Sequence, residues 1–463
     1  MALGVTSDNS AYALLKEYYG PQKLEALVFR NDPVLGNLKK ERIGGKYIPL
    51  PMAVYGNGGV TSDYTQVTSQ AANSYTGVAM QVTPGALFSS FVLDPKEFLA
   101  SQGDRAAFLS VFAVRAFLAM DDLRKMLAAC LYRSGYLEMG PANAVDSTNY
   151  LYVDVDPSTA MAITPGAYIL FGTFTSGAPG VMRSAVPVVV KSIGNVYNTG
   201  YTRITFTSAY VNTVAVGDYL FIKGGMDANN NPQAPVGLAQ WLPAYGNRTG
   251  TTWTTYIGTK FYGVDRSVAP DRLAGQYVLR NISAGETYTQ ALLRGVKVVR
   301  RGGGVPTMIV VNDDDFGQIL QDALANRTFY QDINGGGNKG KNAVTQGVDQ
   351  FQMSFSTSWI NLVYDSPYCP RNYAYILDEE AIRLYGISNS ADILKELPLG
   401  NEPGAPMVES QGEPTTNYVF LADDMYTTTP IALQSGMGLR VDFQFWGNFA
   451  LTAPAHNGVV QFN

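Results

Sequence analysis

The sequence predicts an α+β protein with parts that project from a central body, and three observations support this fold class. One long apolar helix is predicted over residues 104–133. A long hairpin with very few charges precedes it, over residues 46–93. Strands and turns then fill residues 140–245, before a mixed pattern of helix and strand returns over residues 286–325.

The composition indicates a folded chain with an unusually uncharged surface. Hydrophobic residues make up 46% of the 463 residues, whereas charged residues make up only 15%, against about a quarter in ordinary soluble domains. Interfaces between subunits are depleted in Lys, Glu and Asp, so a surface covered by copies of the same chain would explain the deficit. A β-rich secreted protein is the alternative explanation of this composition.

The charge balance argues against a dedicated nucleic-acid binder. The formal net charge is −5 and the sequence pI is about 5.1. A protein that grips phosphates shows a basic patch or a high pI. A container for DNA stays compatible with this charge, because its walls need not bind the backbone.

The first 93 residues are predicted to project from the body. Short helices over residues 11–19 and 22–29 are too short to be stable alone, so residues 1–45 are predicted to form an arm. The hairpin that follows has no charged residue between Asp63 and Asp94. The exposed edges of an isolated uncharged hairpin favour aggregation, so we expect it to lie over a neighbouring molecule.

The helix over residues 104–133 would be about 45 Å long. It is apolar around most of its circumference as far as Asp121, so we expect other elements to cover it on several sides. Arg115 interrupts its most apolar stretch, which is too short and too charged to span a bilayer. The N-terminus has no basic region followed by an apolar core, so we expect no signal peptide.

The remaining segments are predicted as follows. Extended runs over residues 186–191, 201–207 and 217–224 indicate a small β-barrel or sandwich. A helix is predicted from about Glu286, then a strand over residues 307–311. The next helix has one apolar face, and the last strand alternates apolar and polar residues; the apolar positions are Phe316, Ile319, Leu320, Ala323 and Leu324 in the helix and Leu439, Val441, Phe443 and Phe445 in the strand.

Few residues suit catalysis. The single histidine, His456, has no second histidine with which to bind a metal, and we predict a structural role for it. The two cysteines, Cys130 and Cys369, form no disulfide framework, and Cys130 is predicted to be a buried free thiol. Residues 335–341 match the start of a phosphate-binding loop, but Asn342 replaces the Ser or Thr that would bind Mg²⁺, so we predict a surface loop.

Acidic clusters also have structural explanations. Residues 313–315 are three aspartates at the start of a predicted helix, where carboxylates cap free N–H groups. Residues 227–232 lack the Gly and Glu of a calcium loop and are predicted to be a turn-rich loop. We interpret the pairs Asp154/Asp156 and Glu379/Glu380 as surface charges. The sequence therefore predicts no catalytic, cofactor-binding or metal-binding residue, and a protein that is not an enzyme.

Two stretches carry a resemblance to a known family. Residues 305–316, Val-Pro-Thr-Met-Ile-Val-Val-Asn-Asp-Asp-Asp-Phe, resemble an axial-domain strand followed by an acidic-capped helix. Residues 437–460 are similar to a closing segment in which a strand precedes a Pro-containing stretch and a final short strand. Together with the order of arm, hairpin, long helix and mixed region, they resemble the Hong Kong 97-type major capsid proteins of tailed bacteriophages.

The resemblance implies a division of the chain into six parts. They are an N-terminal arm (1–45), an extended loop (46–93), a peripheral domain with a spine helix (94–139), an inserted β-rich domain (140–245), an axial domain (246–390) and returning peripheral strands with the C-terminal segment (391–463). The hairpin beyond Asp63 offers no lysine for the family namesake's isopeptide cross-link, and Lys46 lies at its base, so we expect a non-covalent shell.

The resemblance also implies partners and a place of action. The chain would form hexamers and pentamers of an icosahedral head, built in the host cytoplasm, that encloses double-stranded DNA without sequence-specific contacts. A separate scaffolding protein, a portal and decoration proteins are the implied partners, and no membrane is involved. The alternatives are an encapsulin-like nanocompartment shell, or a β-rich adhesin or carbohydrate-active enzyme.

Overall fold

The structure is a computed structural model of the 463-residue chain. The residues that it describes are 34–35, 38–42, 46–55, 62–63, 65–66, 76–93, 111–325 without 176, 197, 198 and 228, then 351–355, 358–386, 420–423, 426–432 and 439–463. Both helices predicted for residues 1–45 and the loop over residues 335–341 lie outside these ranges.

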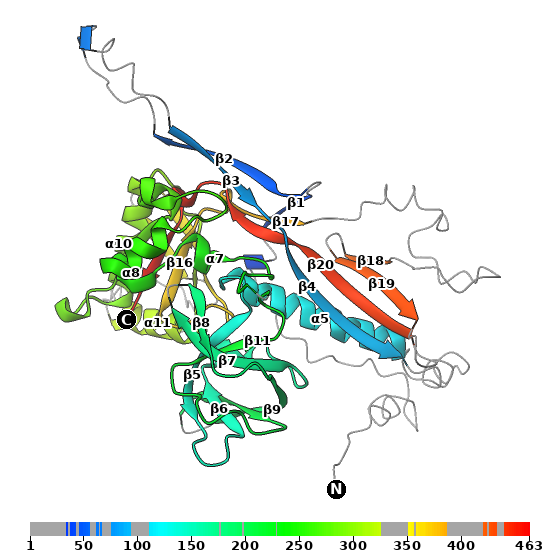
Figure 1. Ribbon diagram of the computed structural model, residues 1–463. Helices are drawn as coiled ribbons and strands as arrows, with labels where there is room; N and C mark the ends of the chain where they lie inside the picture. The colour runs from blue at the N-terminus through cyan, green and yellow to red at the C-terminus, as the bar shows by residue number, and fades with distance from the viewer. Residues whose placement is uncertain are drawn as a thin grey trace, which may run out of the picture.

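The described elements form a two-stranded hairpin and three larger sheets (Figure 1). We call the larger sheets the outer sheet, the barrel and the mixed sheet. The outer sheet and the mixed sheet lie at opposite ends of the molecule, and the barrel lies to one side of both. The fold is α+β, as the sequence predicts.

The outer sheet is built around one long strand, β20 (Leu439–Leu451). Along β20, residues 439–447 pair with β4 on one edge, while the other edge pairs first with β19 and then, over residues 447–451, with β17. The remaining members of the outer sheet are β1 (Lys39–Arg42), β4 (Gly85–Leu93), β17 (Ile382–Gly386), β18 (Phe420–Asp423) and β19 (Tyr426–Ala432). In the predicted final strand, Phe443 and Phe445 are buried on the same face, which confirms that part of the alternation.

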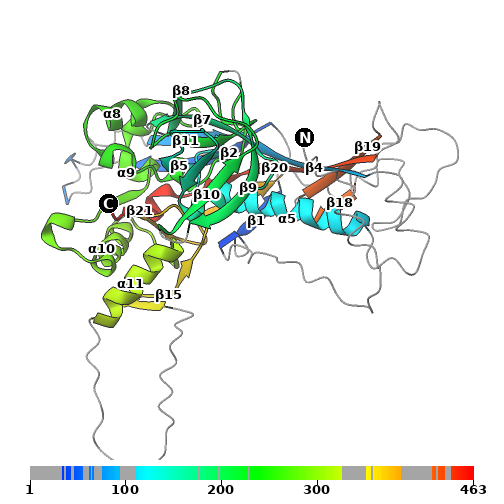
Figure 2. The ribbon, with the colours of Figure 1, turned by 90° about the horizontal axis from the view of Figure 1, so that it is seen from below.

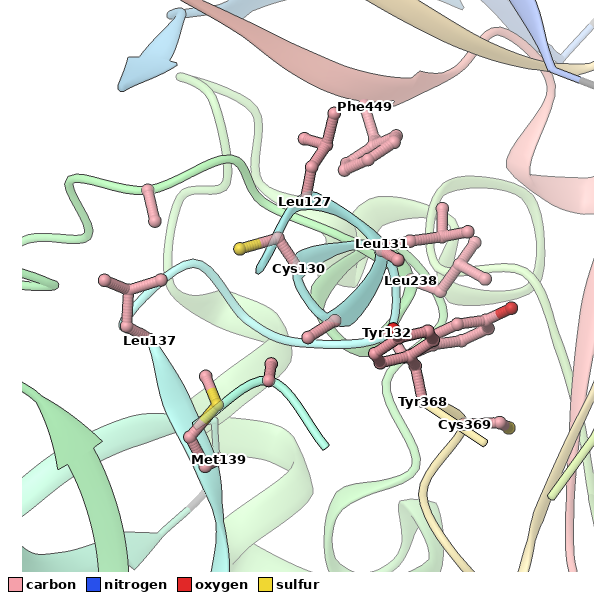
Figure 3. Close-up of a cluster of buried hydrophobic side chains, with 14 of the residues drawn as sticks. Leu127, Cys130, Leu131, Tyr132, Leu137, Met139, Leu238, Tyr368, Cys369 and Phe449 are labelled. Carbon is pink, nitrogen blue, oxygen red and sulfur yellow. The ribbon is translucent and has the colours of Figure 1, made fainter. Parts of the chain in front are cut away.

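The long helix α5 (Val111–Leu131) packs along the outer sheet against β4 and β20 (Figure 2). Its C-terminal turns are buried on several sides, since Leu127 lies near Phe449 of β20 and Leu131 lies near Leu238 (Figure 3). The prediction of a covered helix is confirmed for its C-terminal turns, residues 127–131, whereas Leu118 is 52% exposed. The predicted first turns, residues 104–110, lie outside the described residues.

Residues 138–222 form the barrel. The strand order is β11-β5-β6-β10-β9-β7-β8, and β11 pairs with β7 as well as with β5, so six strands close into a ring with β8 attached to β7. This confirms the prediction of a small barrel or sandwich. Its elements are β5 (Glu138–Val145), β6 (Tyr152–Val155), α6 (Pro157–Ala160), β7 (Tyr168–Thr175), β8 (Ala178–Met182), β9 (Val188–Val196), β10 (Tyr201–Phe206) and β11 (Tyr219–Ile222).

The mixed sheet has the order β12-β21-β16-β13-β15-β14, and the helices α10 and α11 pack beside it. Its central strand β13 is buried at every position, as expected of a strand covered on both faces. The elements are β12 (Gln276–Leu279), α10 (Tyr288–Arg301), β13 (Met308–Val311), α11 (Asp313–Ala325), β14 (Phe351–Phe355), β15 (Ser358–Asp365), β16 (Tyr373–Leu377) and β21 (Gly458–Gln461).

The helix α10 begins at a capping box. The Thr287 hydroxyl accepts the N–H of Gln290, and the Gln290 side chain accepts the N–H of Thr287. Gly295 lets the helix approach the sheet closely, because a Cβ there would lie 2.6 Å from side-chain atoms of Ile376 and Val460. The predicted helix, strand and helix of residues 286–325 are therefore confirmed as α10, β13 and α11.

Short helices connect the three sheets. They are α7 (Leu238–Trp241), η1 (Tyr245–Arg248), α8 (Gly250–Gly258), η2 (Arg266–Val268), α9 (Pro270–Leu273), η3 (Ile282–Ala284) and η4 (Pro454–His456).

The hairpin consists of β2 (Ile48–Tyr55) and β3 (Thr76–Val82), which pair antiparallel with Ile48 opposite Val82. It extends away from the sheets (Figure 1). The prediction of one hairpin over residues 46–93 is wrong at its C-terminal end, because β4 leaves the hairpin and pairs with β20 over nine residues. In sequence, β4 looks like a further strand of the hairpin, and only its long-range pairing with β20 shows that it belongs to the outer sheet.

Candidate interaction surface

The hairpin has one buried and one exposed face. In β2 the side chains of Ile48, Leu50, Met52 and Val54 are buried, and the residues between them are exposed. Two of the exposed residues are prolines at 49 and 51, which remove N–H donors from the strand. Proline within a sheet is confined largely to edges, so β2 is suited to remain an outer strand.

A single buried asparagine ties the base of the hairpin to the body. Asn448 of β20 donates from Nδ2 to the carbonyl of Thr83 (2.7 Å) and to the hydroxyl of Tyr262 (2.8 Å). Its Oδ1 accepts the N–H of Val236 at 2.7 Å. Nearby, Gln81 of β3 donates its N–H to the carbonyl of Tyr262 (3.1 Å). These bonds fix the direction in which the hairpin leaves the outer sheet.

The turn after the hairpin also requires glycine. A Cβ at Gly85 would lie 2.5 Å from backbone atoms of Ala234 and Pro235, so no larger residue fits without moving the chain. The neighbouring Ala86 donates its N–H to the carbonyl of Gln233 at 2.9 Å. The start of β4 is therefore held against the segment that follows the barrel.

The outer sheet exposes an apolar strip on part of its surface. Phe88 is 61% exposed, Val92 is 46% exposed and Trp446 is 39% exposed. The Phe88 and Trp446 rings meet edge to face, with centroids 5.4 Å apart. Leu87, which alternates with these residues along β4, is buried. Large apolar side chains clustered on a surface mark interaction sites, and we call these three residues the apolar strip.

Sequence analysis missed the apolar strip, although a signal for it was present. β4 reads Gly-Ala-Leu-Phe-Ser-Ser-Phe-Val-Leu, with apolar residues on both faces. A strand that is apolar on both faces is covered on both, whether by its own chain or by another. Only the fold reveals which positions α5 leaves uncovered.

The histidine and the cysteines lie in ordinary surroundings. His456 Nδ1 lies 3.9 Å from a carboxylate oxygen of Asp378. Cys130 is a buried free thiol, as predicted, and burial raises the pKa of this thiol well above its usual value. Cys369 is also buried, and its Sγ donates to the carbonyl of Tyr373 at 3.7 Å. Within the ranges described above, no group of three or more His, Cys, Asp or Glu side chains could hold a metal ion.

The loop at Asp227 closes on itself. The Asp227 carboxylate accepts backbone N–H groups of Asn229 and Asn231, both at 2.8 Å, together with the Asn231 side-chain amide at 2.9 Å. These bonds lower the pKa of Asp227. The prediction of a turn-rich loop is confirmed. Glu380 lies on the surface, 3.9 Å from the Lys39 ammonium, in agreement with its interpretation as a surface charge.

The interpretation of the pair Asp154/Asp156 as surface charges is wrong for Asp154. Asp154 is buried in the barrel wall and pairs with Arg203 through two hydrogen bonds of 2.7 and 2.9 Å. Asp156 lies 3.4 Å from Arg371, which also lies 3.4 Å from Asp314 at the start of α11. The two carboxylates therefore stabilise the barrel and its contact with the rest of the chain.

The aspartates at the start of α11 do more than cap the helix. Asn312 supplies a cap, because its Oδ1 accepts the N–H of Asp314 at 3.1 Å. Asp315 is buried and accepts the N–H of Asn372 at 2.6 Å. Burial raises the pKa of Asp315 to about 6. The prediction that all three carboxylates cap the helix is therefore wrong for Asp315.

No protein-family model matches the chain, and no curated protein matches its sequence. A chain from the capsid asymmetric unit of cyanophage A-1(L) is similar in structure, with a TM-score of 0.52 and 12% identity over 98% of this chain and 99% of that chain. A capsid chain of a native GTA particle has a TM-score of 0.45 and 7% identity, over 100% of this chain and 99% of that chain. The holo-SrpI encapsulin of Synechococcus elongatus has a TM-score of 0.39 and 8% identity, over 100% of this chain and 96% of that chain.

The fold is therefore that of a phage capsid protein. It extends over nearly the whole chain at very low sequence identity, which accounts for the lack of a match in sequence. Among the residues that the structure describes, no helix is both long enough and apolar enough to cross a membrane.

Proposed function

We propose that this chain is the major capsid protein of a tailed bacteriophage, with the Hong Kong 97-type arrangement of parts. The observation that carries the proposal is the fold shared with a cyanophage capsid chain over 98% of this chain and 99% of that one. The projecting hairpin and the apolar strip support it, since an extended hairpin is suited to lie over a neighbour and Phe88 and Trp446 are large exposed apolar side chains.

In this proposal each described part has a role. The hairpin β2–β3 lies in the extended loop of residues 46–93, and α5 is the spine helix of the peripheral domain, residues 94–139. The barrel is the inserted domain, residues 140–245. The mixed sheet with α10 and α11 is the core of the axial domain, residues 246–390. Residues 391–463 supply β18, β19 and β20 to the outer sheet and β21 to the mixed sheet, and residues 1–45 form the arm.

The proposed function is assembly into hexamers and pentamers of a shell that encloses double-stranded DNA. Many modest contacts from each subunit add up to a stable shell, because each contact raises the effective concentration for the next. A separate scaffolding protein and a portal are the expected partners, with decoration proteins as further candidates. The virion is then the site of action, with assembly in the host cytoplasm.

The test expresses the full-length chain, alone and with a co-expressed scaffolding protein, and examines the product by electron microscopy and light scattering. Closed shells are the expected result, with DNA as the packaged content in infected cells. Stable monomers under all of these conditions would contradict the proposal. Shells that enclose a protein cargo in place of DNA would identify a nanocompartment instead.

A matched pair of variants locates the contact. Phe88→Asp places a charge on the apolar strip, and we expect the subunit to fold but not to form shells. Val181→Asp places the same charge on the barrel, where Val181 is 68% exposed, and we expect shells to form as before. Equal assembly by both variants would show that the apolar strip is not a subunit contact.

A further inference from the structure

A cavity of about 760 Å³ lies where several separate segments of the chain meet. Its walls come from the turn between β3 and β4, the segment after α5, the turn between β7 and β8 in the barrel, and the helix α8 with the segment after it. Residues of the segment 231–236 and Asn448 of β20 complete the lining. This volume falls in the range of about 300–1,000 Å³ that holds small ligands in proteins. Of the residues that sequence analysis considered for chemistry, Asn231 and Pro232 of the loop at residues 227–232 line it.

The lining of the cavity is cationic and rich in hydroxyl groups. Lys260 and Arg266 both contribute to its wall, and none of the described residues that line it is Asp or Glu. The nearby Asp265 accepts the N–H and the hydroxyl of Ser267 at 2.8 and 2.6 Å, and it also interacts electrostatically with Lys260. In a chain of net charge −5, two cations and no carboxylate in the lining of a cavity favour an anion over a cation there.

Arg266 is the less ordinary of the two cations, because it is only 1% exposed. Its guanidinium donates to the carbonyl of Gln240 (2.7 Å) and to the hydroxyl of Tyr256 (2.8 Å), which are both neutral groups. It also lies over the Phe261 ring, 4.3 Å from the centroid. Its Nε is buried and has no hydrogen-bond partner. A buried cation paired only with neutral groups is costly, and a bound anion offsets that cost.

The walls hold their polar groups in place before any ligand binds. The Tyr256 hydroxyl donates to Gln240 Oε1 at 2.7 Å, and Gln240 Nε2 donates to the carbonyl of Gly177 at 2.6 Å. This chain of bonds joins α8 to the barrel turn on the opposite side. Thr251 and Thr255 are four residues apart, so their hydroxyls share the face of α8 that lines the cavity. The hydroxyl of Thr259, just after the helix, donates to the carbonyl of Thr255 at 3.0 Å.

We propose that this cavity binds a small oxyanion, a phosphate or a carboxylate group, through Lys260, Arg266 and the threonine hydroxyls of α8. Lys260 and Arg266 supply the charge and the hydroxyls donate hydrogen bonds to the anion oxygens. The bound anion also joins the barrel to α8 and to the base of the hairpin. The site is independent of the shell role, because each copy of the chain contains all of these residues.

The test is isothermal titration of the full-length chain with inorganic phosphate and, separately, with glutarate, at an ionic strength held constant with sodium chloride. One saturable site per chain is the expected result. Binding of phosphate alone identifies phosphate as the oxyanion, and binding of glutarate alone identifies a carboxylate. No saturable binding of either anion overturns the proposal.

Variants show whether the anion occupies this cavity. Lys260→Gln removes an exposed charge and is expected to weaken binding by about tenfold, the loss typical of a hydrogen bond to a charged group. Thr255→Val removes one hydroxyl without a change of shape, and we expect a weakening of about threefold. Lys191→Gln removes an exposed charge from the barrel and serves as the control. Binding that is unchanged in both cavity variants, or weakened equally in the control, overturns the proposal.

Discussion

Two phenylalanines of this chain make almost the same ring contact in opposite surroundings. In the barrel, Phe171 meets Phe206 edge to face, with centroids 5.7 Å apart and an interplanar angle of 81°. On the outer sheet, Phe88 meets Trp446 at 5.4 Å and 84°. Phe171 is 3% exposed, whereas Phe88 is 61% exposed. The same edge-to-face ring contact therefore occurs in the buried core of the barrel and on the exposed surface of the outer sheet.

The difference follows from how each sheet ends. In the barrel, β11 pairs with both β5 and β7, so the ring of strands has no free edge. The outer sheet has β1 and β18 at the two ends of its strand order. A closed sheet satisfies its backbone groups within the chain, and an open sheet offers them to a neighbour. The barrel strands pair fully within one copy of the chain, whereas the outer sheet has edge strands that are suited to pair with another copy.

The largest expected effect separates the two phenylalanines. Phe171→Ala leaves a cavity among buried rings and should lower the free energy of unfolding by about 3–5 kcal/mol. Phe88→Ala removes an exposed ring and should lower it by less than about 1 kcal/mol. Chemical denaturation of the unassembled chain measures both. Equal losses from the two changes would contradict the contrast between barrel and outer sheet.

The next effect concerns the base of the hairpin. Asn448→Ala leaves the Val236 N–H without its side-chain acceptor and removes the bonds to Thr83 and Tyr262, so we expect a loss of about 2–3 kcal/mol. Hydrogen exchange should rise in residues 76–93 and not in the barrel. Gln444→Ala, on the same strand, is the control and should change stability by less than about 0.5 kcal/mol. Faster exchange in the barrel alone would refute this prediction.

A third effect depends on pH and lies where the barrel meets α11. Burial raises the pKa of Asp315 to about 6, from an ordinary value of 3.8, so the folded chain holds this proton more tightly than the unfolded chain does. The stability due to this group is therefore greatest below about pH 4 and is lost as the pH rises through 6. Asp315→Asn should add roughly 1–3 kcal/mol at pH 7.5 and little at pH 4. Denaturation at both pH values measures this, and a gain that does not vary with pH would contradict the assignment.

The smallest effect is expected within the barrel wall. Arg203→Lys keeps the charge opposite Asp154 but loses the two-pronged contact and the stacking on Tyr152, where the guanidinium lies 3.8 Å from the ring centroid. Since Arg203 is partly exposed, we expect a loss of no more than about 1 kcal/mol. Thermal melting compares it with Arg301→Lys at the exposed end of α10, which should have no effect. A larger loss than that of Asn448→Ala would reverse the expected order.

Local patterns in the sequence predicted the elements whose contacts are local or uniform. The apolar circumference of α5, the run Met308–Val311 and the alternation around Phe443 and Phe445 were sufficient to predict a covered helix, a buried strand and a half-buried strand. The barrel was predicted as a class of structure, but its closure was not, because the pairing of β11 with β7 joins segments that nothing local connects.

The polar contacts were harder to predict for the same reason. Asn448 and Thr83 are 365 residues apart in the chain, and Asp156 and Arg371 are 215 residues apart. In sequence, Asn448 is an ordinary strand residue, and Asp156 is one of many exposed-looking aspartates. The residues that line the cavity at Lys260 and Arg266 come from six or more separate segments, so no local sequence motif could predict it. The expected absence of catalytic and cofactor-binding residues stays a prediction.

The chain enters the barrel along β5 and leaves it along β11, and these two strands pair with each other, with Tyr219 opposite Pro141. The two ends of the barrel segment therefore lie side by side at one edge. A short turn could join residue 141 to residue 219, and a foreign domain with adjacent termini could be grafted there in place of the barrel. Because the chain enters and leaves the barrel through this one antiparallel strand pair, the barrel is exchangeable as a module, and the strand pair provides a position for peptide display.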